Sequence, residues 1–315
     1  MDGSPPLAGR VALVAGATRG AGRAIAVELG RAGATVYATG RSSRGGGGPS
    51  ELGRPETIEE TGEAIEAAGG TGHALVVDHE DPAAVAGLVA RIHAEQGRLD
   101  VLVNDIFGGD RYMDWEHPLW EHDLAGGLRM LRMGVDTHLI TCHHSLPLLL
   151  ETARAGSTDG LVVEMTDGTE AFNANFRVRV GFYYDLVKAS VGRIVKGLTF
   201  ELSGHPVTAL GVTPGWLRSE RMLEGFGVSE ERWRDALARA PGFAISESPA
   251  YVARGIAALA ADRGVARWAG QIVTSRQLAD AYGVTDTDGS RPDCWGYIDR
   301  YGIDEQSGIG VDEFR

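Results

Sequence analysis

The chain has 315 residues, 43% of them hydrophobic, and its 43 acidic and 30 basic side chains give a formal net charge of −13. This size and composition provide a sizeable core and exclude a disordered chain. The acidic balance argues against a surface for nucleic acid or anionic lipid, because such surfaces need clustered Lys and Arg.

The first residues lack the basic and apolar regions of a signal peptide, and no apolar run approaches the roughly 18 residues of a membrane helix. Two cysteines, Cys142 and Cys294, are too few for a disulfide framework and suit a reducing compartment. A cytoplasmic protein with no membrane partner is therefore expected.

Apolar runs of strand length alternate with longer segments of helical period. Strands are predicted at residues 10–15, 35–39, 73–77, 100–103, 161–165, 207–210 and 271–273, with helices at 22–32, 58–68, 82–96, 128–150 and 182–202. Strands buried on both faces and separated by helices predict an α/β fold, a Rossmann-type doubly wound parallel sheet of about seven strands. We expect one domain over residues 1–285, a short flexible insertion at Gly45–Gly48, and an irregular C-terminal tail over residues 286–315.

A glycine-rich turn joins the first predicted strand to the first helix. It reads Gly16-Ala17-Thr18-Arg19-Gly20-Ala21-Gly22. Glycines at this position let the backbone approach a pyrophosphate, which the helix N-terminus then stabilises. The position of the turn, more than its glycines alone, predicts a dinucleotide site.

The end of the second strand indicates which nicotinamide cofactor binds. A carboxylate there would bind the ribose hydroxyls and repel a 2′-phosphate. This chain instead has Arg41 and Ser42, with a further arginine at Arg19. Guanidinium groups match phosphate oxygens, so the sequence favours NADP(H).

The glycine pattern, Tyr184-x-x-x-Lys188 and Pro214-Gly215 resemble the short-chain dehydrogenase/reductase superfamily over about residues 8–275. The stretch from Leu278 to Gly289 resembles, more narrowly, the subgroup of dehydrogenase/reductase SDR family member 1. The resemblance implies further cofactor-binding residues beyond those of the turn and of the second strand. They are Asp78, His79, Asn104, Tyr184, Lys188, Pro214, Gly215 and Ser219.

The resemblance also implies the catalytic pair. Tyr184 and Lys188 share one face of a predicted helix. In the family the lysine lowers the pKa of the tyrosine and binds the nicotinamide ribose, and the tyrosine protonates the substrate as hydride arrives. An oxidoreductase acting on a carbonyl of a bulky small molecule, or on the reverse alcohol, is the function implied.

Two family residues are absent. The serine position at the end of the fifth strand is occupied by Asp167, with Thr166 as the hydroxyl donor if the register differs by one residue. The family's helix asparagine falls at Gly134. Asp167 is either a neutral acid that donates to the substrate, an ionised counter-ion for a cationic substrate such as an iminium, or a loop cap in a site that lost its chemistry. An imine reductase and a dinucleotide-binding pseudoenzyme or regulator therefore stand as alternatives.

The remaining expectations concern the surroundings of the site. The loop 107–123 and a lid at about residues 216–245 are predicted to wall the substrate. Apolar faces on the helices 128–150 and 182–202 correspond to the family's dimer contacts, so a homodimer or homotetramer is expected. His138 and Cys142 share a helix face without a third ligand, so no metal site is predicted.

Overall fold

The structure is a computed structural model, and it describes residues 4–46, 50, 52–156, 158–177, 180–304 and 306–315. Seven parallel strands form one sheet in the order β3-β2-β1-β4-β5-β6-β7. Their bounds are β1 Val11–Ala15, β2 Thr35–Gly40, β3 Thr71–Val76, β4 Val101–Asn104, β5 Gly160–Met165, β6 Val207–Thr213 and β7 Ile272–Thr274. The predicted doubly wound Rossmann-type sheet is confirmed.

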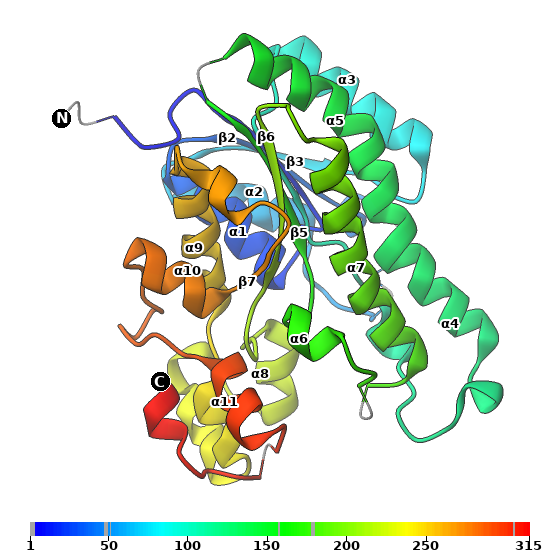
Figure 1. The fold of residues 1–315 in the computed structure, drawn as a ribbon, viewed down its shortest axis with the longest axis vertical. Helices are drawn as coiled ribbons and strands as arrows, with labels where there is room; N and C mark the ends of the chain where they lie inside the picture. The colour runs from blue at the N-terminus through cyan, green and yellow to red at the C-terminus, as the bar shows by residue number, and fades with distance from the viewer. Residues whose placement is uncertain (1–3, 47–49, 51, 157, 178–179, 305) are drawn as a thin grey trace.

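Helices cover both faces of this sheet (Figure 1). One face carries α1 Gly20–Arg31, α2 Ile58–Ala67, α9 Pro249–Ala261 and α10 Ser275–Tyr282. The other carries α3 Pro82–Gln96, α5 Thr137–Ala155 and α7 Phe182–Glu201, with α4 Leu124–Leu131 extending the α5 rod. Short helices α6 Glu170–Asn173, α8 Glu220–Phe226 and α11 Cys294–Tyr301 lie beyond the carboxyl ends of the strands.

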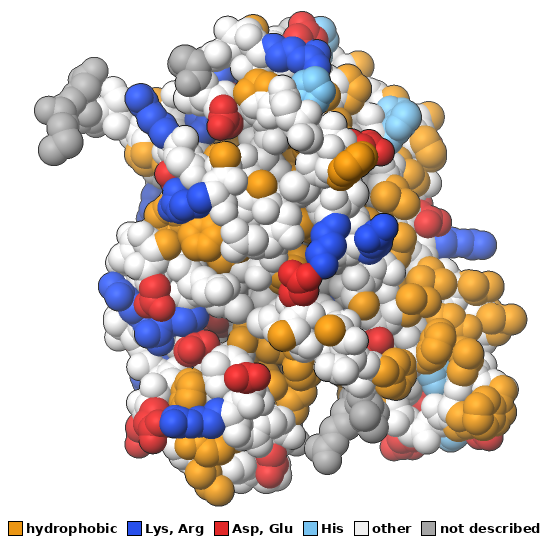
Figure 2. All heavy atoms as spheres, in the orientation of Figure 1, with side chains coloured by type: hydrophobic (Ala, Val, Ile, Leu, Met, Phe, Trp, Pro, Cys, Tyr) orange, Lys and Arg blue, Asp and Glu red, His pale blue; other side chains and the backbone are white. Residues whose placement is uncertain are grey.

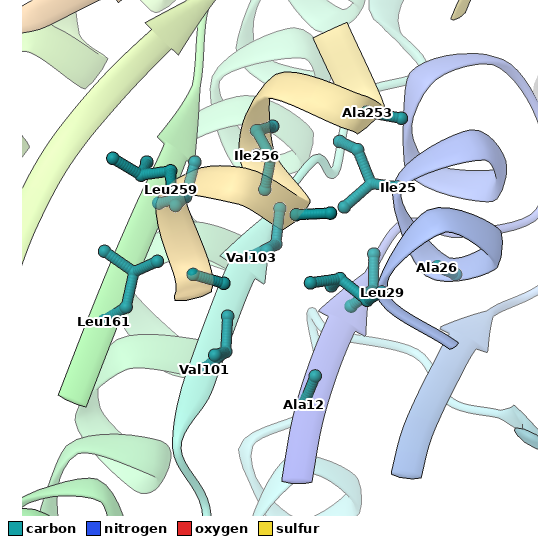
Figure 3. Close-up of a cluster of buried hydrophobic side chains, with 14 of the residues drawn as sticks. Ala12, Ile25, Ala26, Leu29, Val101, Val103, Leu161, Ala253, Ile256 and Leu259 are labelled. Carbon is teal, nitrogen blue, oxygen red and sulfur yellow. The ribbon is translucent and has the colours of Figure 1, made fainter. Parts of the chain in front are cut away.

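The core on the α1 side is built from small and branched side chains. Ile25 and Leu29 of α1 and Ile256 and Leu259 of α9 point toward the sheet, where Val103 contributes from β4 (Figure 3). All five are fully buried. Burial of each such side chain contributes about 1.5–3 kcal/mol, so this layer fixes the glycine-rich turn that opens α1.

The predicted helix 128–150 is one continuous rod, but its helix type changes along its length. A π-helical turn, Arg132–Asp136, separates α4 from α5. Such turns insert one extra residue into the helix and recur at functional sites. Gly134 lies within this turn, where the resemblance places the family's asparagine.

The expectation of an irregular tail is wrong for part of residues 286–315. Helix α11 begins at Cys294 with an Asp293 cap, and a short 3-10 helix covers Val311–Phe314. Cys294 and Tyr297 are buried, so tertiary packing stabilises this helix, which the local sequence pattern does not predict. The predicted insertion Gly45–Gly48 lies partly outside the described residues. Among the described helices none is long and apolar enough to cross a membrane.

Candidate active site

A cavity of about 1570 Å³ opens at the carboxyl ends of the strands. The loops after β1 to β6 contribute to its lining, and α11 adds residues from the C-terminal region. Strand order reverses at β1, and open α/β sheets bind ligands in the crevice at such a point. The volume exceeds the roughly 300–1,000 Å³ of pockets for a single small ligand, which leaves room for a dinucleotide and a substrate together.

The glycine-rich turn forms one wall of this cavity. Gly16 and Gly20 have positive φ angles of 87° and 57°. A Cβ on Gly16 would lie 2.4 Å from the carbonyl oxygen of Asp105, and one on Gly22 would lie 2.4 Å from the carbonyl oxygen of Gly16. The turn therefore requires glycine for its tight path and gives the cradle that a pyrophosphate needs.

A carboxylate already lies at the start of α1. The amide of Gly20 donates hydrogen bonds to the two oxygens of Glu220, at 3.0 and 3.3 Å. The helix N-terminus attracts negative charge, so this contact marks the place where a cofactor phosphate would be stabilised.

The loops after β2 and β3 form the other end of the cavity. Arg41 and Ser42 line it together with Arg19, Asp78 and His79. Nη1 of Arg41 lies 3.2 Å from Oε1 of Glu80, whose other oxygen is bound by Arg129. No carboxylate occupies the position at the end of β2 itself, as the sequence predicted.

The predicted catalytic pair lies on α7, on the side of the helix facing the cavity. Tyr184 and Lys188 both line it. The Lys188 Nζ lies 3.9 Å from the centroid of the Phe107 ring and 5.5 Å from that of Tyr184. The hydroxyl of Thr166 donates to the carbonyl oxygen of Lys188 at 2.8 Å, which fixes this part of α7 to the end of β5.

Asp167 lies against the Tyr184 hydroxyl. The phenolic oxygen of Tyr184 donates to Oδ2 of Asp167 at 2.9 Å. The same carboxylate oxygen accepts a second hydrogen bond, from Nη1 of Arg177 at 3.0 Å. The Thr166 hydroxyl is instead directed at α7, so Asp167 and not Thr166 contacts the Tyr184 hydroxyl.

Comparison with known proteins identifies this arrangement. The family model described as short chain dehydrogenase matches residues 10–225. The chain belongs to the short-chain dehydrogenase/reductase family. A Mus musculus protein named dehydrogenase/reductase SDR family member 1 is 30% identical over 296 residues, which cover 90% of this chain and 85% of that protein.

Solved structures agree with the fold. A short-chain type dehydrogenase/reductase from Mycobacterium marinum superposes with a TM-score of 0.65 at 18% identity, covering 85% of this chain and 94% of that one. A structure from Agrobacterium tumefaciens, solved with bound NADP, gives a TM-score of 0.64 at 24% identity over 87% and 99% of the two chains. A short-chain dehydrogenase/reductase uses a nicotinamide dinucleotide, and the glycine cradle and the long cavity fit that group.

The family's helix asparagine has no equivalent here, for a steric reason. A Cβ on Gly134 would lie 2.4 Å from Cγ1 of Val187 and 3.2 Å from Cδ2 of Phe107. Val187 is buried on α7 directly before Lys188. The close approach of α7 to the π-helical turn therefore excludes any larger side chain at position 134.

Most of the predicted cofactor residues line the cavity, but Gly22 and Asn104 lie beneath its floor. The Asn104 side-chain amide donates to Oε1 of Glu164 at 2.8 Å. Glu164 also accepts from Sγ of Cys142 at 3.1 Å and lies 2.5 Å from Nδ1 of His138. Sequence reasoning missed this buried network, which holds the Asn104 side-chain amide.

Arg177 is the second site residue that sequence reasoning missed. Its side chain is 5% exposed, and besides Asp167 it contacts Asp185 of α7. The available signal was an arginine in the interval between β5 and Tyr184, but no spacing rule connects such a residue to Asp167.

The electrostatic surroundings differ from what the resemblance implied. Burial and the negative charge of Asp167 raise the pKa of Tyr184 well above its usual value. Desolvation in the cavity lowers the pKa of Lys188, and burial raises that of Asp105 to about 6. The net direction for the pKa of Tyr184 is thus opposite to the lowering that the resemblance implied, because the tyrosine hydroxyl is buried and contacts a carboxylate.

Part of the predicted lid, residues 216–245, contributes to the lining of the cavity. Trp216 and Met222 line the cavity. Arg218 is 1% exposed and binds Glu230 and Asp286, at 2.8 and 3.0 Å, so ion pairs attach the lid to the region before α11. The hydroxyl of Ser219 accepts from the amide of Met222 and caps α8.

Proposed function

We propose that this chain is an NADP(H)-dependent oxidoreductase that reduces a carbonyl group of a bulky small molecule or oxidises the corresponding alcohol. The observation that carries the proposal is that Tyr184 and Lys188 share one cavity with the glycine cradle. When bound, the nicotinamide supplies or accepts a hydride. Tyr184 is the general acid. Lys188 binds the nicotinamide ribose and so orients the cofactor beside Tyr184.

Tyr184 can fill this role because its side chain lines the cavity together with Lys188, within reach of a substrate bound there. Phe107 packs edge-on against its ring, with the ring centroids 5.6 Å apart, and so fixes the position of the ring.

The ion pair between Asp167 and Arg177 weighs against the imine alternative. A cationic substrate would have to compete with Arg177, which already lies 3.0 Å from the Asp167 carboxylate. The pseudoenzyme alternative receives less support, because the Tyr184 and Lys188 side chains remain accessible from the cavity.

The preference for NADP rests on Arg41 and Arg19, which line the cavity beside the end of β2. Guanidinium groups bind phosphate oxygens in paired hydrogen bonds. The Glu80 carboxylate holds Arg41 by one nitrogen, at 3.2 Å, and so orients its guanidinium.

The test is NADPH oxidation with a panel of bulky ketones and cyclic imines, and NADP⁺ reduction with the matching secondary alcohols. Tyr184→Phe should lower turnover at least about 100-fold, the lower end of what general acid–base catalysis contributes. Tyr183→Phe is the matched control, since that neighbouring ring packs on the α4 side near Gly127. Turnover of imines alone would favour the alternative, and equal activity of wild type and Tyr184→Phe would refute the proposal.

A further inference from the structure

Arg177 is a buried charge that the proposed function does not use. Its Nη1 donates to Oδ2 of Asp167 at 3.0 Å, and its Nε and backbone amide both donate to Oδ1 of Asp185, at 3.2 and 3.0 Å. The guanidinium carbon also lies 5.6 and 5.4 Å from the ring centroids of Phe172 and Tyr184. Two carboxylates and two aromatic rings thus fix this group in one place.

Asp167 presents one oxygen to two donors. Its Oδ2 accepts from the Arg177 guanidinium and also from the Tyr184 hydroxyl, at 2.9 Å. This oxygen is therefore an acceptor in both contacts, and a carboxylate is the usual partner of a guanidinium. Of the three interpretations of Asp167 that the sequence left open, the neutral donor therefore receives the least support.

An ionised acceptor changes what Tyr184 can do. A serine at this position would donate a hydrogen bond toward a substrate oxygen. Asp167 instead directs the Tyr184 proton toward itself and away from Lys188, whose Nζ lies over Phe107. The tyrosine oxygen is then free to accept a proton from another group while its own proton leaves.

We propose that Asp167, held ionised by Arg177, accepts the proton of Tyr184, so that a neutral tyrosine acts as the base in the oxidation of a secondary alcohol. This inference rests on the proposed function and specifies the proton path at the same site. Asp167 is the proton acceptor, and Arg177 is a positioning residue that acts through it.

The step balances in atoms and electrons. The O–H bond of the alcohol breaks as its proton moves to the Tyr184 oxygen, and the original phenolic proton moves to Oδ2 of Asp167. When the oxidised nicotinamide is bound, the carbinol carbon would give it a hydride (one proton with two electrons) and would become the carbon of a ketone. The Asp167 side chain is 38% exposed, so its new proton can leave to water.

The first test needs no substrate. Aspartate labelled with ¹³C at the side-chain carboxyl gives a signal for Asp167 that is assigned by its loss in Asp167→Asn, and its shift is followed from pH 4 to pH 9. We expect the ionised form at pH 7, and a higher midpoint in Arg177→Gln than in wild type, because the variant removes the positive charge beside the carboxylate. Arg193→Gln, at an exposed position on α7, is the control and should leave the midpoint unchanged.

A second variant covers a failure of Arg177→Gln to fold. Tyr184→Phe removes the other donor to Oδ2 and should also raise the Asp167 midpoint, whereas Tyr183→Phe should not. A protonated Asp167 at pH 7, or a midpoint that neither Arg177→Gln nor Tyr184→Phe moves, would overturn the inference.

The second test is the pH dependence of alcohol oxidation with NADP⁺, using the fastest alcohol of the panel. In wild type kcat/KM should stay level from pH 9 down to the Asp167 midpoint. In Asp167→Ser the reaction needs an ionised Tyr184, so kcat/KM should rise about tenfold per pH unit across the neutral range. Identical profiles would reject Asp167 as the acceptor while leaving the proposed function intact. Absence of turnover would reject the proposed function, and the carboxyl titration would still decide the state of Asp167.

Discussion

At the scale of single residues, Arg41 is the side chain that should decide between the two nicotinamide cofactors. It lines the cavity where β2 ends, beside Ser42, and Glu80 orients its guanidinium. Hydrogen bonds to charged groups contribute about 1.5–3 kcal/mol, which corresponds to roughly 10- to 100-fold in affinity. We predict that Arg41→Ala weakens NADPH binding by about tenfold or more and changes NADH binding little, measured by quenching of tryptophan fluorescence.

Arg44→Ala provides the matched control, because Arg44 is exposed and pairs with Glu63 on the surface of α2. If Arg41→Ala weakens the binding of NADPH and NADH equally, Arg41 supports the loop and does not bind the 2′-phosphate.

The buried Glu164–His138 pair contributes to the stability of the fold beside the candidate site. Both side chains are at most 2% exposed, and Nε2 of His138 lies 3.1 Å from the carbonyl oxygen of Ile106. Removal of one partner of a buried hydrogen-bonded pair leaves the other polar group unsatisfied and costs about 1–3 kcal/mol. We predict a loss of that size in the free energy of unfolding for His138→Ala, from urea denaturation. His143→Ala, exposed on the same helix, should stay within about 0.5 kcal/mol of wild type.

The residues in and beneath the candidate site divide by the kind of information that specifies them. Tyr184 and Lys188 follow from a four-residue helical spacing, and Asp167 from its place after a strand, so a linear pattern contains them. Arg177 and Glu164 gain their roles only through contacts with α7 and α5, and such contacts depend on the packing of distant elements. The local sequence accordingly gave no indication of either role.

At the scale of elements, the junction between the π-helical turn and α7 is the tightest contact beside the site. A Cβ on Gly134 in the turn would lie 2.4 Å from Cγ1 of Val187 on α7. A Cβ on Gly192 of α7 would have no atom outside its own stretch of helix backbone within 4 Å. Overpacking costs about 1–3 kcal/mol, and a helical Gly-to-Ala change in open space stabilises by about 0.4–1 kcal/mol. Gly134→Ala should thus lower the melting temperature and Gly192→Ala should raise it. A rise in both would show that α7 can move away from the turn.

His79 links two elements and makes stability depend on pH. Its ring nitrogens lie 2.8 Å from the hydroxyls of Thr39 on β2 and Thr141 on α5, and burial lowers its pKa to about 4. The unfolded chain binds the proton near pH 6.5, so between pH 6.5 and 4 unfolding takes up a proton and stability falls as pH falls. The contribution lost between pH 7 and pH 5 is about 2 kcal/mol.

We predict that the free energy of unfolding, from urea denaturation, falls between pH 7 and pH 5 by about 2 kcal/mol less in His79→Gln than in wild type. His93→Gln, on the exposed side of α3, should keep the wild-type difference. A His79→Gln protein with the full wild-type difference would mean that His79 is protonated in the folded state.

Elements with a strong local pattern were predictable and those fixed by tertiary contacts were not. The seven strands lie within a few residues of their predicted positions because each is a short apolar run between turns. Helix α11 has eight residues, and Cys294 at its start packs against Gly215 after β6. The order of this helix comes from that contact and from the hydrogen bond of Trp295 to the Pro214 carbonyl, at 2.8 Å.

At the scale of the whole molecule, an exposed apolar surface on α4 and α7 distinguishes one side of the chain. Leu124 and Leu128 of α4 are 62% and 44% exposed, Leu186 of α7 is 40% exposed, and hydrophobic side chains gather over this region at the lower right in Figure 2. Contiguous apolar patches on a soluble chain mark association surfaces. We propose that this face joins copies of the chain into the homodimer or homotetramer that the sequence led us to expect.

Light scattering coupled to size exclusion tests this association. Leu128→Glu places a charge within the apolar face, where its desolvation opposes contact between copies, and should shift the measured mass to that of a single 33.4 kDa chain. Ile309→Glu, at a 67% exposed position in the C-terminal region, should leave the mass of the assembly unchanged. A wild-type chain that is monomeric at micromolar concentration would refute the association. An assembly that survives Leu128→Glu would place its contact on another face, and the exposed leucines of α4 would then need a different partner to cover them.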